Sequence, residues 1–197
     1  MKTVIIKYNA GNIQSVLFAL ERIGVQAVVT DDPAEILSAH KVIFPGVGEA
    51  STAMQYLKER ELDKLIVSLQ QPVLGICLGM QLLCAYSEEN DTRCLGVFDQ
   101  VKVRKFSNEG TAFKVPQTGW NSIQQLKGPL FDQVNENEFC YFVHSFYAEM
   151  NAYTCGTTDY RQPYSSALQR NNFYGVQFHP EKSAKAGEQI LKNFLTL

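Results

Sequence analysis

The residue with the clearest capacity for chemistry is a cysteine flanked by glycines. Cys77 stands in residues 75–79 (Gly-Ile-Cys-Leu-Gly), between the apolar run 71–74 and the apolar, helix-forming run 80–86. A strand, a tight turn and a helix in this order form a nucleophile elbow, in which small flanking residues let a strained backbone hold the nucleophile forward. With the Gly and Cys content of this chain, the pattern Gly-x-Cys-x-Gly is expected to occur by chance about 0.02 times in a sequence of this length. The competing interpretation is a buried structural cysteine beside a turn.

A cysteine nucleophile needs a general base and a group that orients the base. His179 lies in residues 175–181 (Gly-Val-Gln-Phe-His-Pro-Glu). On extended backbone the side chains of i and i+2 project to the same side, so Glu181 can reach the His179 ring. Pro180 stiffens the link between them. The sequence therefore predicts Cys77, His179 and Glu181 as nucleophile, base and orienting carboxylate, and the alternative for the histidine is a turn at the end of a strand.

The other two histidines of the chain have simpler interpretations. His40 precedes an expected strand among charged residues, so we expect it at the surface. His144 follows the aromatic-rich run 139–143, where a structural histidine is the default interpretation.

A second glycine-flanked loop, residues 45–48 (Pro-Gly-Val-Gly), follows the third expected strand. In open α/β sheets ligands bind at the carboxyl ends of the strands. A backbone N–H near Val47 can join that of Leu78 as an oxyanion hole. The loop is neither a Walker loop nor a dinucleotide fingerprint, because the Lys-Ser/Thr and Gly-x-Gly-x-x-Gly patterns are absent. A helix-initiating turn is the alternative.

Strands and helices are expected to alternate in the first half of the chain. Strands are expected at 3–6, 25–29, 42–44 and 72–76, and helices at 12–23, 32–38 and 50–70, the last as one or two helices. The second half carries short β-like runs at 97–104, 120–125, 139–143, 146–150, 154–158, 165–169 and 173–177, before a last helix at 184–197. The expected class is α/β, with an open, mostly parallel (mixed) central sheet flanked by helices in a single domain, residues 1–197.

Bulk composition argues against several classes of function. Hydrophobic residues make up 45% and charged residues 19% of the 197 residues, as in globular domains. The net charge of -2 gives no footprint for nucleic acid or an anionic membrane, and no apolar run approaches the ~20 residues of a membrane span. The N-terminus is strand-like, unlike a signal peptide. Five cysteines without Cys-x-x-Cys spacing indicate neither a disulfide framework nor a zinc site, so we expect a reducing cytoplasm, no metal and no cofactor.

Taken together, the motifs resemble those of the class I (triad) glutamine amidotransferases. The matching segments are 45–48, 75–81 (Gly-Ile-Cys-Leu-Gly-Met-Gln) and 177–183 (Gln-Phe-His-Pro-Glu-Lys-Ser). Other segments resemble the histidine-pathway members of this class, at 9–12 (Asn-Ala-Gly-Asn), 87–89, 115–116, 119–121 and 141–146 (Tyr-Phe-Val-His-Ser-Phe). The matching segments run along nearly the whole chain.

The resemblance implies a reaction and a role for each matching residue. Cys77 would attack the side-chain amide of glutamine, His179 would carry the proton to the departing ammonia, and Glu181 would hold the ring. Leu78 and Val47 would supply the oxyanion hole. The residues implied to hold glutamine are Gly46, Gly48, Gln81, Glu89, Ser145 and Phe146.

The resemblance also implies a partner. Ammonia would pass to a (β/α)₈-barrel cyclase subunit in a heterodimer of histidine biosynthesis. The residues expected to meet that partner are Asn12, Trp120, Tyr141 and Lys182. Because the glycine-flanked peptide at 45–48 can rotate cheaply, we expect the free subunit to be nearly inactive until partner and ligand complete the oxyanion hole.

Three alternatives remain open. A glutaminase subunit serving pyridoxal phosphate synthesis is disfavoured by segments 8–12 and 141–146. A cysteine hydrolase of the α/β-hydrolase type is disfavoured because the acid precedes the histidine there, whereas Glu181 follows His179 here. A pseudo-glutaminase that only scaffolds or regulates a synthase is disfavoured by the intact set of catalytic residues.

Overall fold

The first half of the chain forms the parallel part of a large sheet. The computed structural model describes residues 1–9, 11–107 and 114–197, so Ala10 of the 9–12 segment lies outside the described residues. The elements are β1 (Thr3–Ile6), α1 (Ile13–Arg22), β2 (Ala27–Thr30), α2 (Pro33–Leu37), β3 (Lys41–Gly46), α3 (Ala50–Glu59), α4 (Leu62–Ser68), β4 (Val73–Cys77) and α5 (Leu78–Leu83). Strand β1 pairs with β2 and β3, and β3 pairs with β4, all in parallel.

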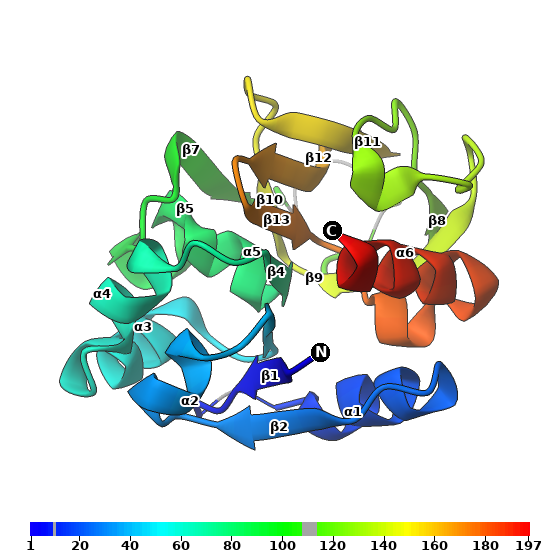
Figure 1. The fold of residues 1–197 in the computed structure, drawn as a ribbon. Helices are drawn as coiled ribbons and strands as arrows, with labels where there is room; N and C mark the ends of the chain where they lie inside the picture. The colour runs from blue at the N-terminus through cyan, green and yellow to red at the C-terminus, as the bar shows by residue number, and fades with distance from the viewer. Residues whose placement is uncertain (10, 108–113) are drawn as a thin grey trace.

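The second half extends this sheet with mostly antiparallel strands. Its elements are β5 (Cys84–Ser87), β6 (Thr92–Arg93), β7 (Phe98–Lys105), β8 (Gln117–Ser122), β9 (Phe139–His144), β10 (Phe146–Ala148), β11 (Thr154–Tyr160), β12 (Gln162–Arg170), β13 (Phe173–Val176) and α6 (Ala184–Thr196). The strand order is β2-β1-β3-β4-β13-β12-β10-β7-β5-β6, with β11 beside β12 and a separate β8-β9 ribbon (Figure 1). The mixed sheet flanked by helices confirms the expected fold class.

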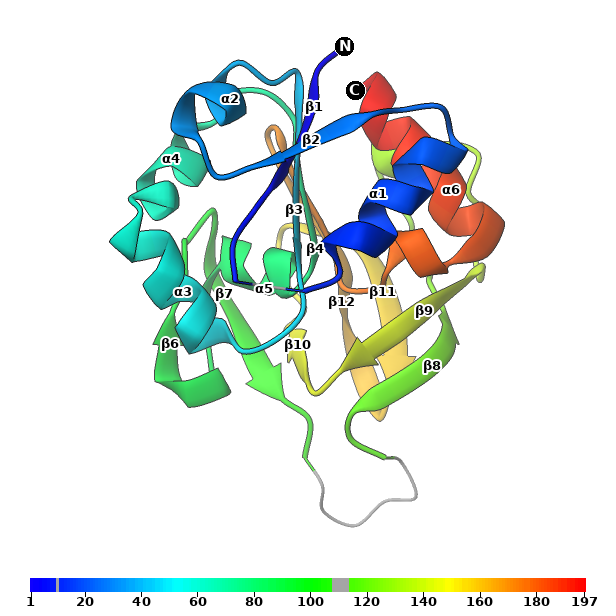
Figure 2. The ribbon, with the colours of Figure 1, turned by 90° about the horizontal axis from the view of Figure 1, so that it is seen from below.

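The central parallel strands of the sheet bury both of their faces under helices. Along β1, Val4 and Ile6 point into the core under α2, α3 and α4, whereas Ile5 points into the core under α1 and α6. Figure 2 shows the two helical layers on opposite sides of β1, β3 and β4. This alternation explains why β1, β3 and β4 are almost continuously apolar. No helix among the described residues is long and apolar enough to cross a membrane.

One expected helix is shorter than its sequence suggests. The run 80–86 favours a helix throughout, yet α5 ends at Leu83 and Cys84 begins a strand. Strand β5 pairs in parallel with β7 and antiparallel with β6. Pairing with strands later in the chain has therefore overridden local helix propensity.

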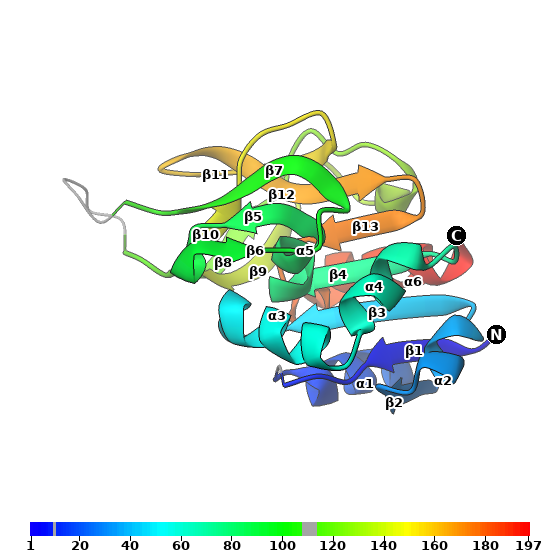
Figure 3. The same cartoon turned by 90° about the vertical axis from the view of Figure 1, so that its left-hand side faces the viewer.

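Parallel register brings the expected chemical groups to one edge. Gly46 at the end of β3 lies opposite Cys77 at the end of β4, and Val176 at the end of β13 lies opposite Ile76. Figure 3 shows β3, β4 and β13 side by side. The 45–48 loop, the elbow and the segment after β13 therefore share the carboxyl edge of the sheet, where ligands bind in such folds.

Close packing of α5 on β3 gives a testable result for Gly79. A Cβ atom at this position would lie 1.8 Å from the Phe44 carbonyl oxygen, which is backbone. We expect Gly79→Ala to lower the free energy of unfolding by at least about 3 kcal/mol, because the clash can be relieved only by moving β3 or α5. Urea unfolding measures the loss.

The matched control for this substitution is Gly156→Ala in β11. There the nearest atom to an added Cβ is the Ala167 side chain at 3.2 Å. We expect the control to lose about 1 kcal/mol or less. Equal stability of the Gly79→Ala variant and the unsubstituted chain would show that α5 does not pack closely on β3.

Candidate active site

Cys77 sits on a strained turn between β4 and α5. Its backbone has φ 54° and ψ −110°, a conformation that side-chain-bearing residues adopt rarely. The flanking glycines are required by space as well: a Cβ atom on Gly75 would lie 2.8 Å from the Met80 backbone nitrogen. The Cys77 side chain is nearly buried, and its sulfur lies 4.0 Å from the Val143 carbonyl oxygen. The sequence-predicted elbow is present.

His179 and Glu181 form a buried hydrogen-bonded pair directly after β13. The His179 Nδ1 atom lies 2.7 Å from Glu181 Oε1. Because a carboxylate accepts hydrogen bonds, Nδ1 carries the proton and leaves Nε2 as the free ring nitrogen. The Asn12 side-chain amide donates to the same carboxylate oxygen. A second donor thus fixes the carboxylate that orients the ring.

The pKa of His179 reflects its interaction with Cys77. Burial alone would lower its pKa, but interaction with the Cys77 sulfur and the Glu181 carboxylate outweighs burial and raises the pKa. His179 Nε2 makes no hydrogen bond of normal geometry to the described protein atoms. Catalytic hydrogen bonds are often long or poorly aligned before substrate binds. The missing hydrogen bond at Nε2 is therefore compatible with His179 acting as the base for Cys77.

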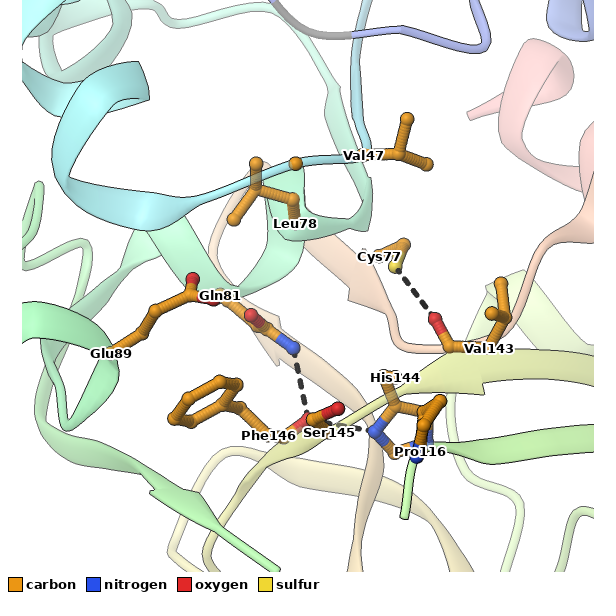
Figure 4. A pocket seen from close by; sticks show the side chains of 11 residues that line it. Val47, Cys77, Leu78, Gln81, Glu89, Pro116, Val143, His144, Ser145 and Phe146 are labelled. Atoms are coloured by element: carbon orange, nitrogen blue, oxygen red, sulfur yellow. Dashed lines mark hydrogen bonds between the residues drawn. The ribbon is translucent and has the colours of Figure 1, made fainter.

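A cavity of about 420 Å³ opens in front of Cys77 (Figure 4). The sequence-predicted residues that line it are Val47, Gly48, Cys77, Leu78, Gln81, Glu89, Ser145 and Phe146. The cavity thus gathers side chains from the 45–48 loop, the elbow and the region of β9 and β10. Its volume suits a small ligand such as an amino acid.

Gly46 has a different place from the one expected. It is buried behind the loop and does not line the cavity. A Cβ atom there would lie 2.0 Å from the Tyr8 hydroxyl and 3.2 Å from the Leu78 Cβ. Gly46 therefore lets the end of β3 lie close against Tyr8 and the elbow, and it is not part of the cavity wall.

Two polar side chains, those of Glu89 and Gln81, make one part of the cavity wall polar. The Glu89 carboxylate accepts the Ala50 backbone N–H at 2.8 Å, and burial raises its pKa despite that hydrogen bond. The Gln81 amide nitrogen donates to the Phe146 carbonyl oxygen at 3.0 Å. A cavity with a carboxylate on its wall and a cysteine sulfur can hold a ligand that bears both an ammonium group and an electrophilic carbon.

Sequence reasoning assigned no site role to several residues that the structure places here. Pro116 and Val143 line the cavity, and so does His144. His144 is buried with Nδ1 2.7 Å from the Phe146 carbonyl oxygen, and burial lowers its pKa to about 4. These contacts support the structural interpretation of His144. The buried Gln177 places its amide nitrogen 3.7 Å from the Cys77 sulfur, and its only sequence signal was its place in the 177–183 motif.

Three of the four residues expected at the partner surface lie together. The Trp120 and Tyr141 rings pack edge to face with centroids 6.1 Å apart, on paired positions of β8 and β9. Lys182 Nζ lies 6.0 Å from the Tyr141 ring centre, and Trp120 remains 53% exposed. Asn12 differs, because its amide turns inward to Glu181.

The chain matches the model of the family described as glutamine amidotransferase class-I over residues 4–197. It belongs to this family. Relatives named imidazole glycerol phosphate synthase subunit HisH are 56% identical in a strain of Bacteroides fragilis and 55% identical in Bacteroides thetaiotaomicron, over the whole of both chains in each comparison. A HisH of Vibrio parahaemolyticus is 44% identical over all of this chain and 98% of its own.

Solved structures show the same fold at low sequence identity. A structure of a glutamine amidotransferase has a TM-score of 0.75 at 15% identity and covers 98% of this chain and 97% of its own. The structure of PurLQS from Thermotoga maritima has a TM-score of 0.72 at 14% identity, covering 99% and 97%. These likenesses establish the fold alone.

Proposed function

We propose that this chain is the glutaminase subunit of an imidazole glycerol phosphate synthase, with residues 1–197 as one glutamine amidotransferase domain. It hydrolyses glutamine and passes ammonia to a (β/α)₈-barrel cyclase subunit. That subunit makes imidazole glycerol phosphate and an aminoimidazole carboxamide ribotide in the histidine biosynthesis of the cytoplasm. The observation that carries the chemistry is the buried His179–Glu181 pair beside Cys77 at the carboxyl edge of the sheet. Full-length similarity to subunits named HisH carries the choice of pathway.

The first half of the reaction forms a thioester. The Cys77 thiol gives its proton to His179, the sulfur bonds to the side-chain amide carbon of glutamine, and the carbonyl π electrons move to the oxygen, which becomes an oxyanion. The backbone N–H of Leu78, at the start of α5, and an N–H of the loop at Val47 stabilise that charge. When the carbon–nitrogen bond breaks, His179 gives its proton to the leaving nitrogen, and ammonia departs.

The second half releases glutamate. A water molecule gives a proton to His179 as its oxygen attacks the thioester carbon, and the Cys77 sulfur leaves as thiolate. Glu181 holds the imidazole ring through both steps and stabilises its protonated form, which is consistent with the raised pKa of His179.

Substrate binding follows from the polar groups of the cavity. Glu89 offers a carboxylate to the α-ammonium group of glutamine, and the backbone at Ser145 and Phe146 contacts the amino-acid head. Gln81 holds this backbone through its hydrogen bond to Phe146. Gly48, with φ 126°, lets the loop approach the substrate closely.

The surface formed by Trp120, Tyr141 and Lys182 is the proposed docking site of the cyclase. Exposed aromatic residues and a neighbouring cation are frequent centres of protein interfaces. The Tyr141 carbonyl oxygen accepts the His179 backbone N–H at 2.9 Å, so this surface is joined directly to the segment that carries the base. Docking here can therefore set the position of His179.

Partner dependence separates this proposal from its alternatives. We expect glutamate release from glutamine to rise at least about 100-fold when the cognate barrel subunit and its ribonucleotide ligand are added, as completion of an oxyanion hole would give. The matched control is the barrel subunit of a pyridoxal phosphate synthase, which should give no stimulation.

The other outcomes each contradict a defined part of the proposal. Activity that ignores the partner would retain the glutaminase and remove the histidine-pathway role. Stimulation by the control barrel would assign the chain to the other pathway. Inactivity in every combination would leave a non-catalytic scaffold.

A further inference from the structure

We propose that Gln177 is a positioning residue for the glutaminase reaction, holding the Cys77 thiolate in place by donating a side-chain N–H to the sulfur. The inference deepens the proposed function and rests on Cys77 being its nucleophile. Gln177 Nε2 lies 3.7 Å from Cys77 Sγ, within the range of an N–H···S hydrogen bond. The Gln177 side chain is completely buried and does not line the cavity, so it acts on the nucleophile and not on the substrate.

The orientation of the Gln177 amide is fixed by a chain of hydrogen bonds. The Phe146 carbonyl oxygen can only accept, so the Gln81 atom that lies 3.0 Å from it is the amide nitrogen. The same nitrogen of Gln81 lies 2.9 Å from Gln177, which must therefore present its oxygen there. The remaining atom of the Gln177 amide, the one that faces Cys77, is the N–H donor.

Gln177 and His179 lie two residues apart in the bent segment that directly follows β13. Gln177 donates its backbone N–H to the Ser166 carbonyl oxygen at 2.9 Å, and His179 donates its own to the Tyr141 carbonyl oxygen at 2.9 Å. One segment thus brings both a base and a hydrogen-bond donor to the sulfur.

Besides His179, the sulfur has a neighbour that suits each of its protonation states, Val143 and Gln177. As a thiol, Cys77 can donate to the Val143 carbonyl oxygen, which lies 4.0 Å away. As a thiolate it can only accept, and Gln177 then supplies an uncharged donor in addition to His179. Hydrogen bonds to a charged acceptor are roughly twice as strong as those between neutral groups, so Gln177 favours the reactive form.

The test removes the donor and keeps the volume. Gln177→Met places an apolar side chain of similar length beside the sulfur, and Gln177→Leu is a second apolar variant with a different shape. In the reconstituted complex we expect alkylation of Cys77 by iodoacetamide at pH 7 to slow about tenfold in both variants, and the midpoint of its pH profile to move to higher pH. We expect kcat for glutamine hydrolysis to fall by a similar factor with little change in KM.

Asn193→Leu is the matched control, because Asn193 is a buried amide of α6 that donates to the Leu130 and Asp132 carbonyl oxygens. It should lose stability in urea while keeping the pH profile of Cys77. An unchanged alkylation profile in a folded Gln177→Met or Gln177→Leu chain would overturn the inference. Alkylation needs no glutamine chemistry, so this result is independent of whether the complex proves to be the proposed synthase.

Discussion

Replacement of Cys77 by alanine is expected to abolish glutamine-dependent synthesis in the reconstituted complex and to leave ammonia-dependent synthesis intact. Loss of the sulfur removes the atom that forms the thioester, and loss of a nucleophile costs at least about 10⁴-fold in rate in comparable enzymes. Ammonia supplied in solution bypasses this step, because the barrel subunit carries out the second reaction. Product formation by the complex, measured with each nitrogen source in turn, shows both effects.

Cys84→Ala is the control for this substitution. Cys84 is completely buried at the start of β5, with its thiol 3.5 Å from the Met80 carbonyl oxygen. We expect a small loss of stability and little change in either activity. If Cys77→Ala removed both activities, the two reactions would not be separable as proposed, and a large kinetic loss in Cys84→Ala would mean that the wrong cysteine has been assigned.

Glu181→Gln is expected to lower kcat for glutamine hydrolysis by about 10²- to 10⁴-fold in the complex. The neutral amide keeps the shape of the side chain but removes the charge that holds the His179 proton on Nδ1. It can also turn its NH₂ group toward the ring and select the wrong tautomer. Steady-state hydrolysis of glutamine by the complex measures the loss.

The pH dependence of kcat/KM for Glu181→Gln should also shift in a defined direction, which a merely structural defect would not cause. Interaction with the Cys77 sulfur and the Glu181 carboxylate raises the pKa of His179, so removing the carboxylate lowers it. His179 must be protonated to give its proton to ammonia, and the alkaline limb of kcat/KM therefore moves to lower pH.

The control for this variant is Glu188→Gln on α6, where an exposed carboxylate pairs with Lys192. We expect it to change neither rate nor profile. A Glu181→Gln complex that kept its rate within a few-fold and its profile unchanged would remove Glu181 from the proposed mechanism.

Features set by local sequence could be predicted, whereas those set by distant pairing could not. The helix expected at 32–38 is present as α2, which starts where Asp32 accepts the Ala34 and Glu35 backbone N–H groups and Pro33 fills the first turn. The strand at Cys84 could not be predicted, because its partner β7 lies across a loop and local propensity favours helix.

The site shows the same division. The contact of His179 with Glu181 could be predicted from their spacing, but its geometry differs from the expectation, because Glu181 lies in a 3-10 turn after His179 and not on extended backbone. The contact of Asn12 with Glu181 depends on the left-handed backbone of Asn12, with φ 73°, which directs the start of α1 toward η3 (Pro180–Lys182). The donor role of Gln177 depends on the orientation of its amide, which is fixed by the hydrogen bonds from Gln81 to Phe146 and Gln177. No sequence pattern predicts this orientation.

Covalent labelling of the complex by a glutamine-analogue electrophile, followed by peptide mapping of its cysteines, tests most directly whether Cys77 is the nucleophile. Burial raises the pKa of Cys84 well above its ordinary value and those of Cys94, Cys140 and Cys155 to about 12, so these thiols are poor nucleophiles at neutral pH. We expect one label per chain, on Cys77, formed more slowly when glutamine is present. A label on another cysteine of the chain, no label at all, or labelling of Cys77 that glutamine does not slow would contradict the proposed active site.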